Sequence, residues 1–113
     1  MHELSIMESA LSQACGRARE AGATRVYSIT LRIGALSGVV PEALEFAFEA
    51  LAPGTMAESA RLVVEHVPAR FSCTTCGKEF VAGELFSLCP DCQTPSNDLR
   101  SGREMELASL EIE

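Results

Sequence analysis

The chain has 113 residues, of which 47% are hydrophobic and 22% charged, and its formal net charge is −7. This size and apolar content fit one domain, or a domain with a small appendage, and exclude a large multidomain enzyme and a disordered chain. The nine basic residues are scattered, which argues against nucleic-acid binding, and no apolar run reaches the roughly 20 residues of a membrane span.

The first third of the chain predicts a helix followed by a strand. Over residues 4–21 apolar side chains recur every three or four positions, which places them on one helical face. These side chains are Leu4, Met7, Leu11, Ala14 and Ala18. Cys15 lies one position past this stripe and is expected to be a core residue rather than a ligand or a redox thiol. Residues 24–33 then alternate as a half-buried strand, with Tyr27, Ile29, Leu31 and Ile33 on one face.

The middle of the chain repeats this order. Pro41 opens a second helix, whose buried stripe consists of Leu44, Ala47, Phe48 and Leu51. Its acidic residues Glu42, Glu45 and Glu49 lie on the exposed side, where they are solvated or dock a basic partner. Residues 62–67 are rich in branched aliphatic side chains and predict a second strand.

Residues 72–101 differ from the rest, because they contain short polar turns and four cysteines in place of a helix or strand period. A third strand follows at 104–112. We expect it to pair with the second strand, so that the two paired strands hold residues 72–101 at both ends. The predicted fold is α/β, with two helices on a small three-stranded sheet and an inserted zinc-knuckle domain with four cysteine ligands. The predicted division is an α/β domain of 1–71 and 102–113 and an inserted domain of 72–101.

The strongest chemical motif is the array Cys73, Cys76, Cys89 and Cys92. A spacing of two residues within each pair lets one tight turn direct both sulfurs at one ion. Four protein ligands close a tetrahedral shell, so the site is expected to be structural, with zinc preferred over the iron of a rubredoxin-like centre. An odd number of cysteines in two close pairs suits metal binding in a reducing compartment, which predicts a cytoplasmic protein.

A second metal site is suggested at the start of the chain. The amine of Met1, the first peptide nitrogens and the imidazole of His2 are able to chelate one ion, and such nitrogen ligands suit square-planar nickel or copper. Taken by itself, a histidine in this position is more often an ordinary solvated side chain.

The opening Met-His-Glu-Leu-Ser-Ile, the later Val-Pro-Glu-Ala-Leu-Glu-Phe-Ala-Phe and the twin cysteine pairs together resemble the HypA/HybF hydrogenase nickel-incorporation family over essentially the whole chain. The resemblance implies a metallochaperone that carries Ni(II) as cargo while its zinc stays bound. It also implies that His2 is the key nickel ligand, with the amine of Met1 and nearby backbone nitrogens completing the site and Glu3 close by. The domain of 1–71 and 102–113 is then the nickel-binding domain, and the domain of 72–101 the zinc-binding domain. The implied partners are a HypB-like nickel-handling GTPase and the hydrogenase large-subunit precursor, and some relatives also serve urease maturation.

No Ser-His-Asp order, phosphate-binding glycine loop or paired catalytic carboxylates are found, so we expect no enzymatic activity. Two other functions remain open from the residues alone. A rubredoxin-like iron electron carrier predicts red protein that is indifferent to loss of His2. A zinc-ribbon adaptor that binds only proteins predicts one zinc ion and no measurable nickel affinity.

Overall fold

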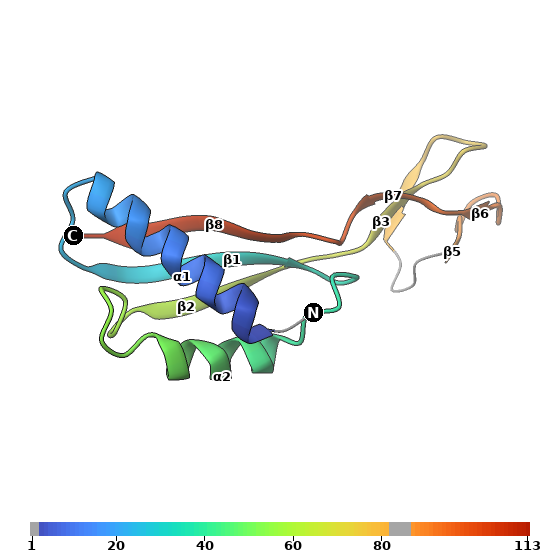
Figure 1. Ribbon diagram of the computed structural model, residues 1–113. Helices are drawn as coiled ribbons and strands as arrows, with labels where there is room; N and C mark the ends of the chain where they lie inside the picture. Colours follow the sequence, from blue (N-terminus) through green and yellow to red (C-terminus); the bar gives the residue numbers. More distant parts are fainter. Residues whose placement is uncertain (1–2, 82–86) are drawn as a thin grey trace. The chain divides into compact units, whose positions relative to one another are not determined.

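Figure 1 shows the computed structural model of the chain, which describes residues 3–81 and 87–113. The larger elements are α1 (Glu3–Glu20), β1 (Val26–Gly34), α2 (Pro41–Leu51), β2 (Arg61–Val67) and β8 (Met105–Ile112). Between β2 and β8 lie five short strands: β3 (Arg70–Ser72), β4 (Glu79–Val81), β5 (Ser87–Leu88), β6 (Pro95–Ser96) and β7 (Asp98–Ser101). None of the helices in these two ranges is long and apolar enough to cross a membrane.

The chain divides into two compact units. The first consists of Met1–Arg32, Val39–Glu65 and Glu106–Glu113, and the second of Ile33–Gly38 and His66–Met105. All four paired cysteines belong to the second unit. The separate nickel and zinc roles assigned to the two parts of the chain remain predictions.

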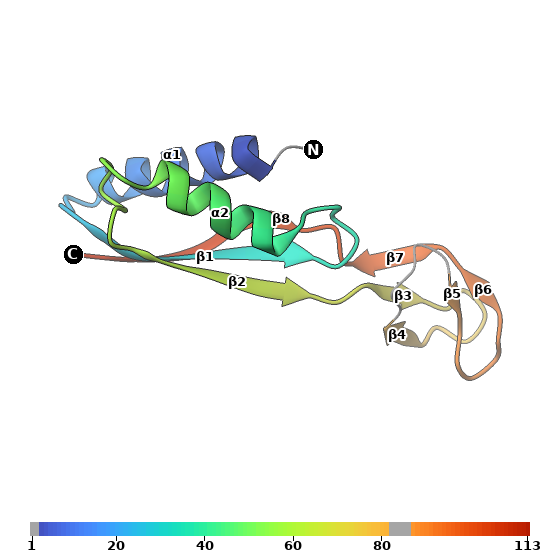
Figure 2. The same cartoon turned by 90° about the horizontal axis from the view of Figure 1, so that it is seen from below.

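The first unit is an α/β layer in which α1 and α2 cover the same face of the sheet formed by β2, β1 and β8 (Figures 1 and 2). The fully buried side chains in its core include Met7, Ile29, Leu31 and Leu44. Burial of each such aliphatic side chain contributes roughly 1.5–3 kcal/mol. Cys15 is also buried among these residues, which confirms its place in the core.

The order of strands in this sheet is β2-β1-β8, so β1 lies at the centre. The arrowheads of β1 and β2 point the same way in Figure 2, and α2 lies in the crossover that parallel neighbours require. β8 runs antiparallel to β1, and backbone hydrogen bonds join Thr24 N to Glu113 O (2.8 Å) and Glu113 N to Arg25 O (3.0 Å). The expected pairing of the second strand with the last is therefore wrong, because β1 separates them.

The buried face of β1 departs from strict alternation near its start. Val26 is fully buried, whereas Tyr27 is 38% exposed, although the sequence pattern placed Tyr27 on the buried face. The guanidinium of Arg25 lies 4.6 Å from the centroid of the Tyr27 ring, and a hydrogen bond with Glu113 raises the pKa of Tyr27 above its usual value. Polar partners at the sheet margin therefore hold this ring outside the core.

The second unit is built on two small β-structures. β3 is the middle strand of an antiparallel sheet with the order β4-β3-β7, in which Phe71 pairs with Phe80 and with Leu99. β5 and β6 form a separate antiparallel hairpin that pairs Leu88 with Pro95. The segment expected to consist of turns thus contains short strands, each too brief to produce a recognisable period.

Gly34 and Gly102 approach each other closely enough to exclude a side chain. A Cβ on Gly34 would lie 2.1 Å from both the carbonyl carbon and oxygen of Gly102. The backbone there is held in place, because Gly34 N donates to Glu104 O (2.8 Å) and Leu36 N donates to Gly102 O (2.6 Å).

We therefore expect Gly34→Ala to lower the free energy of unfolding by about 3 kcal/mol, the upper part of the usual range for forced overpacking. Urea denaturation followed by circular dichroism measures this loss. The matched control is Gly16→Ala in α1, where an added Cβ meets no atom within 4 Å and should stabilise the helix by about 0.5–1 kcal/mol. Equal stability of the two variants would contradict the argument.

Candidate metal centre

The first cysteine pair forms the turn of a hairpin between β3 and β4. Cys73 follows β3 directly, its N–H donates to Lys78 O (2.9 Å), and its carbonyl accepts from Gly77 N (2.9 Å). Gly77 has φ +74°, a left-handed conformation in which glycine carries no steric penalty. This tight turn places Cys76 back beside Cys73.

The second cysteine pair repeats this turn between β5 and β6. Cys89 N donates to Thr94 O (3.0 Å), and Cys89 O accepts from Gln93 N (2.8 Å). The left-handed position is here occupied by Gln93, with φ +56°, which costs a non-glycine residue about 1 kcal/mol. The same backbone hydrogen bonds thus form both turns, which we call the knuckles (residues 73–78 and 89–94). Only the first knuckle has the expected glycine.

The two knuckles bring their four thiols together. The Sγ atoms of Cys73, Cys76, Cys89 and Cys92 all lie within 4.8 Å of one another. Sγ of Cys73 is 3.3 Å from Sγ of Cys92, and Sγ of Cys76 is 3.8 Å from Sγ of Cys89. Tetrahedral zinc with Zn–S bonds of about 2.3 Å separates its sulfurs by about 3.8 Å, so this donor set fits the ion in number, chemistry and spacing. The prediction that these cysteines form one cluster is confirmed.

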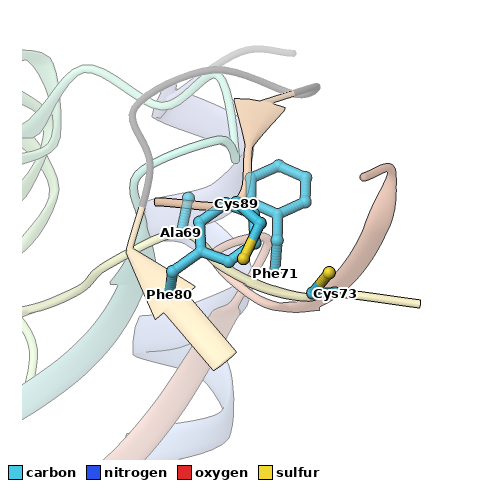
Figure 3. Close-up of a cluster of buried hydrophobic side chains, with 5 residues drawn as sticks. All are labelled: Ala69, Phe71, Cys73, Phe80 and Cys89. Atoms are coloured by element: carbon cyan, nitrogen blue, oxygen red, sulfur yellow. The ribbon is translucent and has the colours of Figure 1, made fainter. Parts of the chain in front are cut away.

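The first cysteine of each pair is part of the apolar core of the second unit. Cys73 and Cys89 are 1% and 0% exposed, whereas Cys76 and Cys92 are exposed. Figure 3 shows the two buried thiols with Ala69 and the rings of Phe71 and Phe80, whose centroids are 5.9 Å apart. The metal site and this small core therefore form one structure, and neither is complete without the other.

The crowded sulfurs do not ionise alike. Hydrogen bonds from the backbone N–H of Cys76, and further ones from Cys92 and Thr75, lower the pKa of Cys73 to about 6 against the effect of burial. For Cys76 the backbone N–H of Lys78 lowers the pKa, but hydrogen bonding with Cys73, burial and the other thiols outweigh it and raise the pKa to about 11. The thiolate of Cys73 thus forms readily while ionisation of Cys76 is opposed, and a divalent cation bound among the four sulfurs would counter this opposition.

Two polar contacts join the knuckles besides the thiols. Lys78, just after the first pair, forms a 2.6 Å ion pair with Asp91, which lies inside the second pair. Asp91 raises the pKa of Lys78, but both side chains are exposed, so water screens the pair and it contributes little to stability. Ser96 is buried; its hydroxyl donates to Ser72 O and accepts from Asp98 N.

The sequence reasoning missed these three residues. Opposite charges at the two cysteine pairs, Lys78 just after the first pair and Asp91 inside the second, were the available signal for the ion pair. Nothing in the sequence distinguishes Ser96 from the neighbouring surface serines, because its burial depends on the packing of β6 near β3.

The predicted nickel ligands fall at the edge of the described chain. Met1 and His2 lie outside the described residues. Glu3 begins α1, and its Oε2 accepts a hydrogen bond from Val40 N (3.2 Å) just before α2. The Glu3 carboxylate is thus tied to the start of the second helix.

Comparison with known proteins identifies the family. The model for "Hydrogenase/urease nickel incorporation, metallochaperone, hypA" matches residues 1–112. The chain belongs to the HypA family. A HypA hydrogenase maturation factor of Picosynechococcus sp. is 48% identical over 112 residues, with 99% of each chain covered, and one of Geobacter metallireducens is 48% identical over 113 residues, with both chains covered completely.

Solved structures of HypA proteins have the same fold. The solution structure of the Ni metallochaperone HypA from Helicobacter pylori superposes with a TM-score of 0.67 at 23% identity, covering 99% of this chain and 97% of that one. A second HypA solution structure gives 0.71 at 24% identity, covering 99% and 96%. At these identities the likeness concerns the fold alone, and with the sheet order and the cysteine cluster described above it confirms the predicted α/β class. The function of the family is hydrogenase nickel incorporation.

Proposed function

We propose that this HypA protein binds Ni(II) through His2 at its N-terminus and delivers it to a [NiFe]-hydrogenase precursor, while zinc remains in the four-cysteine site. The observation that carries the proposal is the closed cluster of four thiols in a chain of a nickel-incorporation family. A closed tetrahedral shell has no open position through which a cargo ion is exchanged. The transferred metal therefore requires a second site.

The zinc assignment rests on the ligands. Four thiolates in two knuckles are a common structural zinc site, and their spacing fits Zn–S bonds of about 2.3 Å. When bound, zinc supplies a positive charge that cross-links the two hairpins. The buried sulfurs of Cys73 and Cys89 would hold it from the core side and the exposed sulfurs of Cys76 and Cys92 from the solvent side.

The nickel assignment rests on the likeness of the opening Met-His-Glu to the start of the family and on ligand chemistry. Among residues 3–81 and 87–113, the four cysteines are the one group of three or more metal-binding side chains that meet. The nitrogen donors of Met1, His2 and the first peptide bonds suit Ni(II), and a site at a chain end releases its ion without unfolding a core. The backbone nitrogen of Glu3 completes this donor set in the proposal.

The proposed partners follow from the family. A HypB-like nickel-handling GTPase and the hydrogenase large-subunit precursor would exchange nickel with this protein in the cytoplasm, and urease is a further proposed recipient. The protein's role is delivery without catalysis. Its acidic surface makes nucleic acid and anionic membranes poor partners, because both would repel it.

The test is a paired count of nickel and zinc on untagged protein that begins at Met1, compared with protein carrying one glycine before Met1. The extension moves the terminal amine away from His2. Loss of a residue that only hydrogen-bonds to a metal ligand weakens metal binding by about 10–100-fold. The extension removes a proposed ligand itself, so we expect nickel affinity to fall by at least about 100-fold. Zinc should remain at one ion per chain in both proteins. Calorimetric titration measures the first quantity and elemental analysis the second.

Each rival function gives a different result in this experiment. Equal nickel affinity in the two proteins would contradict the N-terminal site. Iron and red colour in place of zinc would indicate the rubredoxin-like carrier. One zinc ion with no nickel affinity in the native protein would indicate a zinc-ribbon adaptor.

A further inference from the structure

The most exposed large apolar side chain in the described part of the chain is Phe46, on α2. It is 74% exposed, whereas the next two residues of the helix, Ala47 and Phe48, are buried in the core. An aromatic side chain left in water forgoes the free energy that its burial would provide, so packing within the first unit does not account for the position of Phe46.

Two acidic side chains are helical neighbours of Phe46. On the surface of a helix the neighbours of a residue are three and four positions away, and for Phe46 these include Glu42 and Glu49. Glu45, three positions after Glu42 and four before Glu49, extends the acidic face that they form. All three glutamates are exposed, and α2 has no basic residue in its last turn. The ion pairs found in residues 3–81 and 87–113 involve none of them.

We propose that this face of α2, defined by Glu42, Glu45, Phe46 and Glu49, docks a cationic polypeptide segment whose apolar side chains close over Phe46. Protein interfaces commonly have an aromatic side chain at the centre and polar residues around it. Here the Phe46 ring would become buried in the complex, and the glutamates would determine which charge the partner carries. The carboxylates of this face select lysine and arginine in the partner. The proposal is independent of the metal that the protein carries.

The charges disfavour the other occupants. A second copy of the chain docked through the same face would bring three glutamates against three glutamates, and opposed like charges destabilise an interface. Nucleic acid and anionic lipid carry the wrong sign for the same reason. A basic protein segment is the occupant that satisfies both the ring and its acidic neighbours.

The test uses two synthetic amphipathic 15-residue helical peptides, one with lysines on its polar face and leucines on the other, and a counterpart with glutamates in place of the lysines. Their binding to the full-length protein is followed by amide chemical shifts at low and high salt. We expect the lysine peptide to shift amides of α2, to bind about tenfold more weakly to Phe46→Ala, and to weaken as salt rises. The glutamate peptide should not bind.

Two control variants distinguish binding of the peptide to the α2 face from its non-specific attraction to an acidic protein. Val81→Ala removes another exposed apolar side chain, and Glu20→Gln/Glu111→Gln removes the same charge as Glu42→Gln/Glu49→Gln at exposed sites elsewhere. We expect the peptide to lose affinity with the α2 pair and to keep it with both controls. Unchanged binding to Phe46→Ala, shifts outside α2, or equal losses in the two charge pairs would overturn the proposal. So would a dimer in sedimentation that Phe46→Ala dissociates, since a second copy would then be the occupant.

Discussion

Replacing Cys73 with serine is expected to release the zinc proposed for the four-cysteine site and to unfold the second unit while the first unit stays folded. Serine removes one of four sulfur ligands, and its hydroxyl is a poor substitute for a thiolate. Structural zinc contributes roughly 10–16 kcal/mol of apparent binding free energy, which exceeds the total stability of most small domains. Cys73 also packs in the core with Phe71, so the substitution leaves a polar group among apolar side chains.

The measurement is a zinc count together with amide spectra of the intact chain. Signals from residues 66–105 should collapse to narrow dispersion, and those of α1 and β1 should keep their positions, because the chain forms two compact units. The matched control is Cys15→Ala, which removes the one cysteine outside the cluster. That variant should keep its zinc and lose about 1 kcal/mol of stability from the first unit. Full zinc content and native spectra in Cys73→Ser would refute the assignment of this ligand.

Replacing His2 with alanine is expected to abolish specific nickel binding, with a loss of at least about 100-fold in affinity. Loss of a residue that hydrogen-bonds to a metal ligand costs about 10–100-fold in affinity, and loss of the ligand itself should cost more. Zinc content and thermal stability should remain those of the native protein, because four cysteines complete the zinc shell without any histidine. Nickel calorimetry and a zinc count on the same samples measure both quantities.

Two further substitutions make this result specific. His66→Ala removes the other histidine, which lies on β2, and should leave nickel affinity unchanged. Glu3→Gln retains the backbone nitrogen and a side-chain oxygen able to accept from Val40 N, so its nickel affinity should fall far less than that of His2→Ala. If His66→Ala abolished binding and His2→Ala did not, the nickel site would have to be placed elsewhere in the chain.

The proposed separation of the two metals has a simple chemical basis. Soft thiolates in a closed shell retain zinc, whereas nitrogen donors at a chain end offer nickel a site that opens easily. A single site would have to satisfy the opposite demands of permanence and release. Two sites built from different ligands satisfy each demand separately.

The helices and the cysteine cluster were predictable because the signals for them are local. The apolar period over residues 4–21 reports the buried face of α1, and most of that stripe, from Met7 to Ala18, is indeed buried. A spacing of two residues within each cysteine pair determines that both sulfurs of a pair reach one point. Four sulfurs then suffice to predict a closed metal site.

The order of the strands was decided only by the tertiary structure. Alternation along a strand reports which side chains are buried, but it contains no information on which strand lies beside it. The parallel crossover through α2 makes β1 the neighbour of β2, and β8 then adds to the free edge of β1. The same limit applies to the Lys78–Asp91 ion pair, to the burial of Ser96 and to the left-handed Gln93. Each depends on contacts between residues distant in sequence or on a backbone conformation imposed by them, whereas helix faces and cysteine turns depend on neighbours a few residues away.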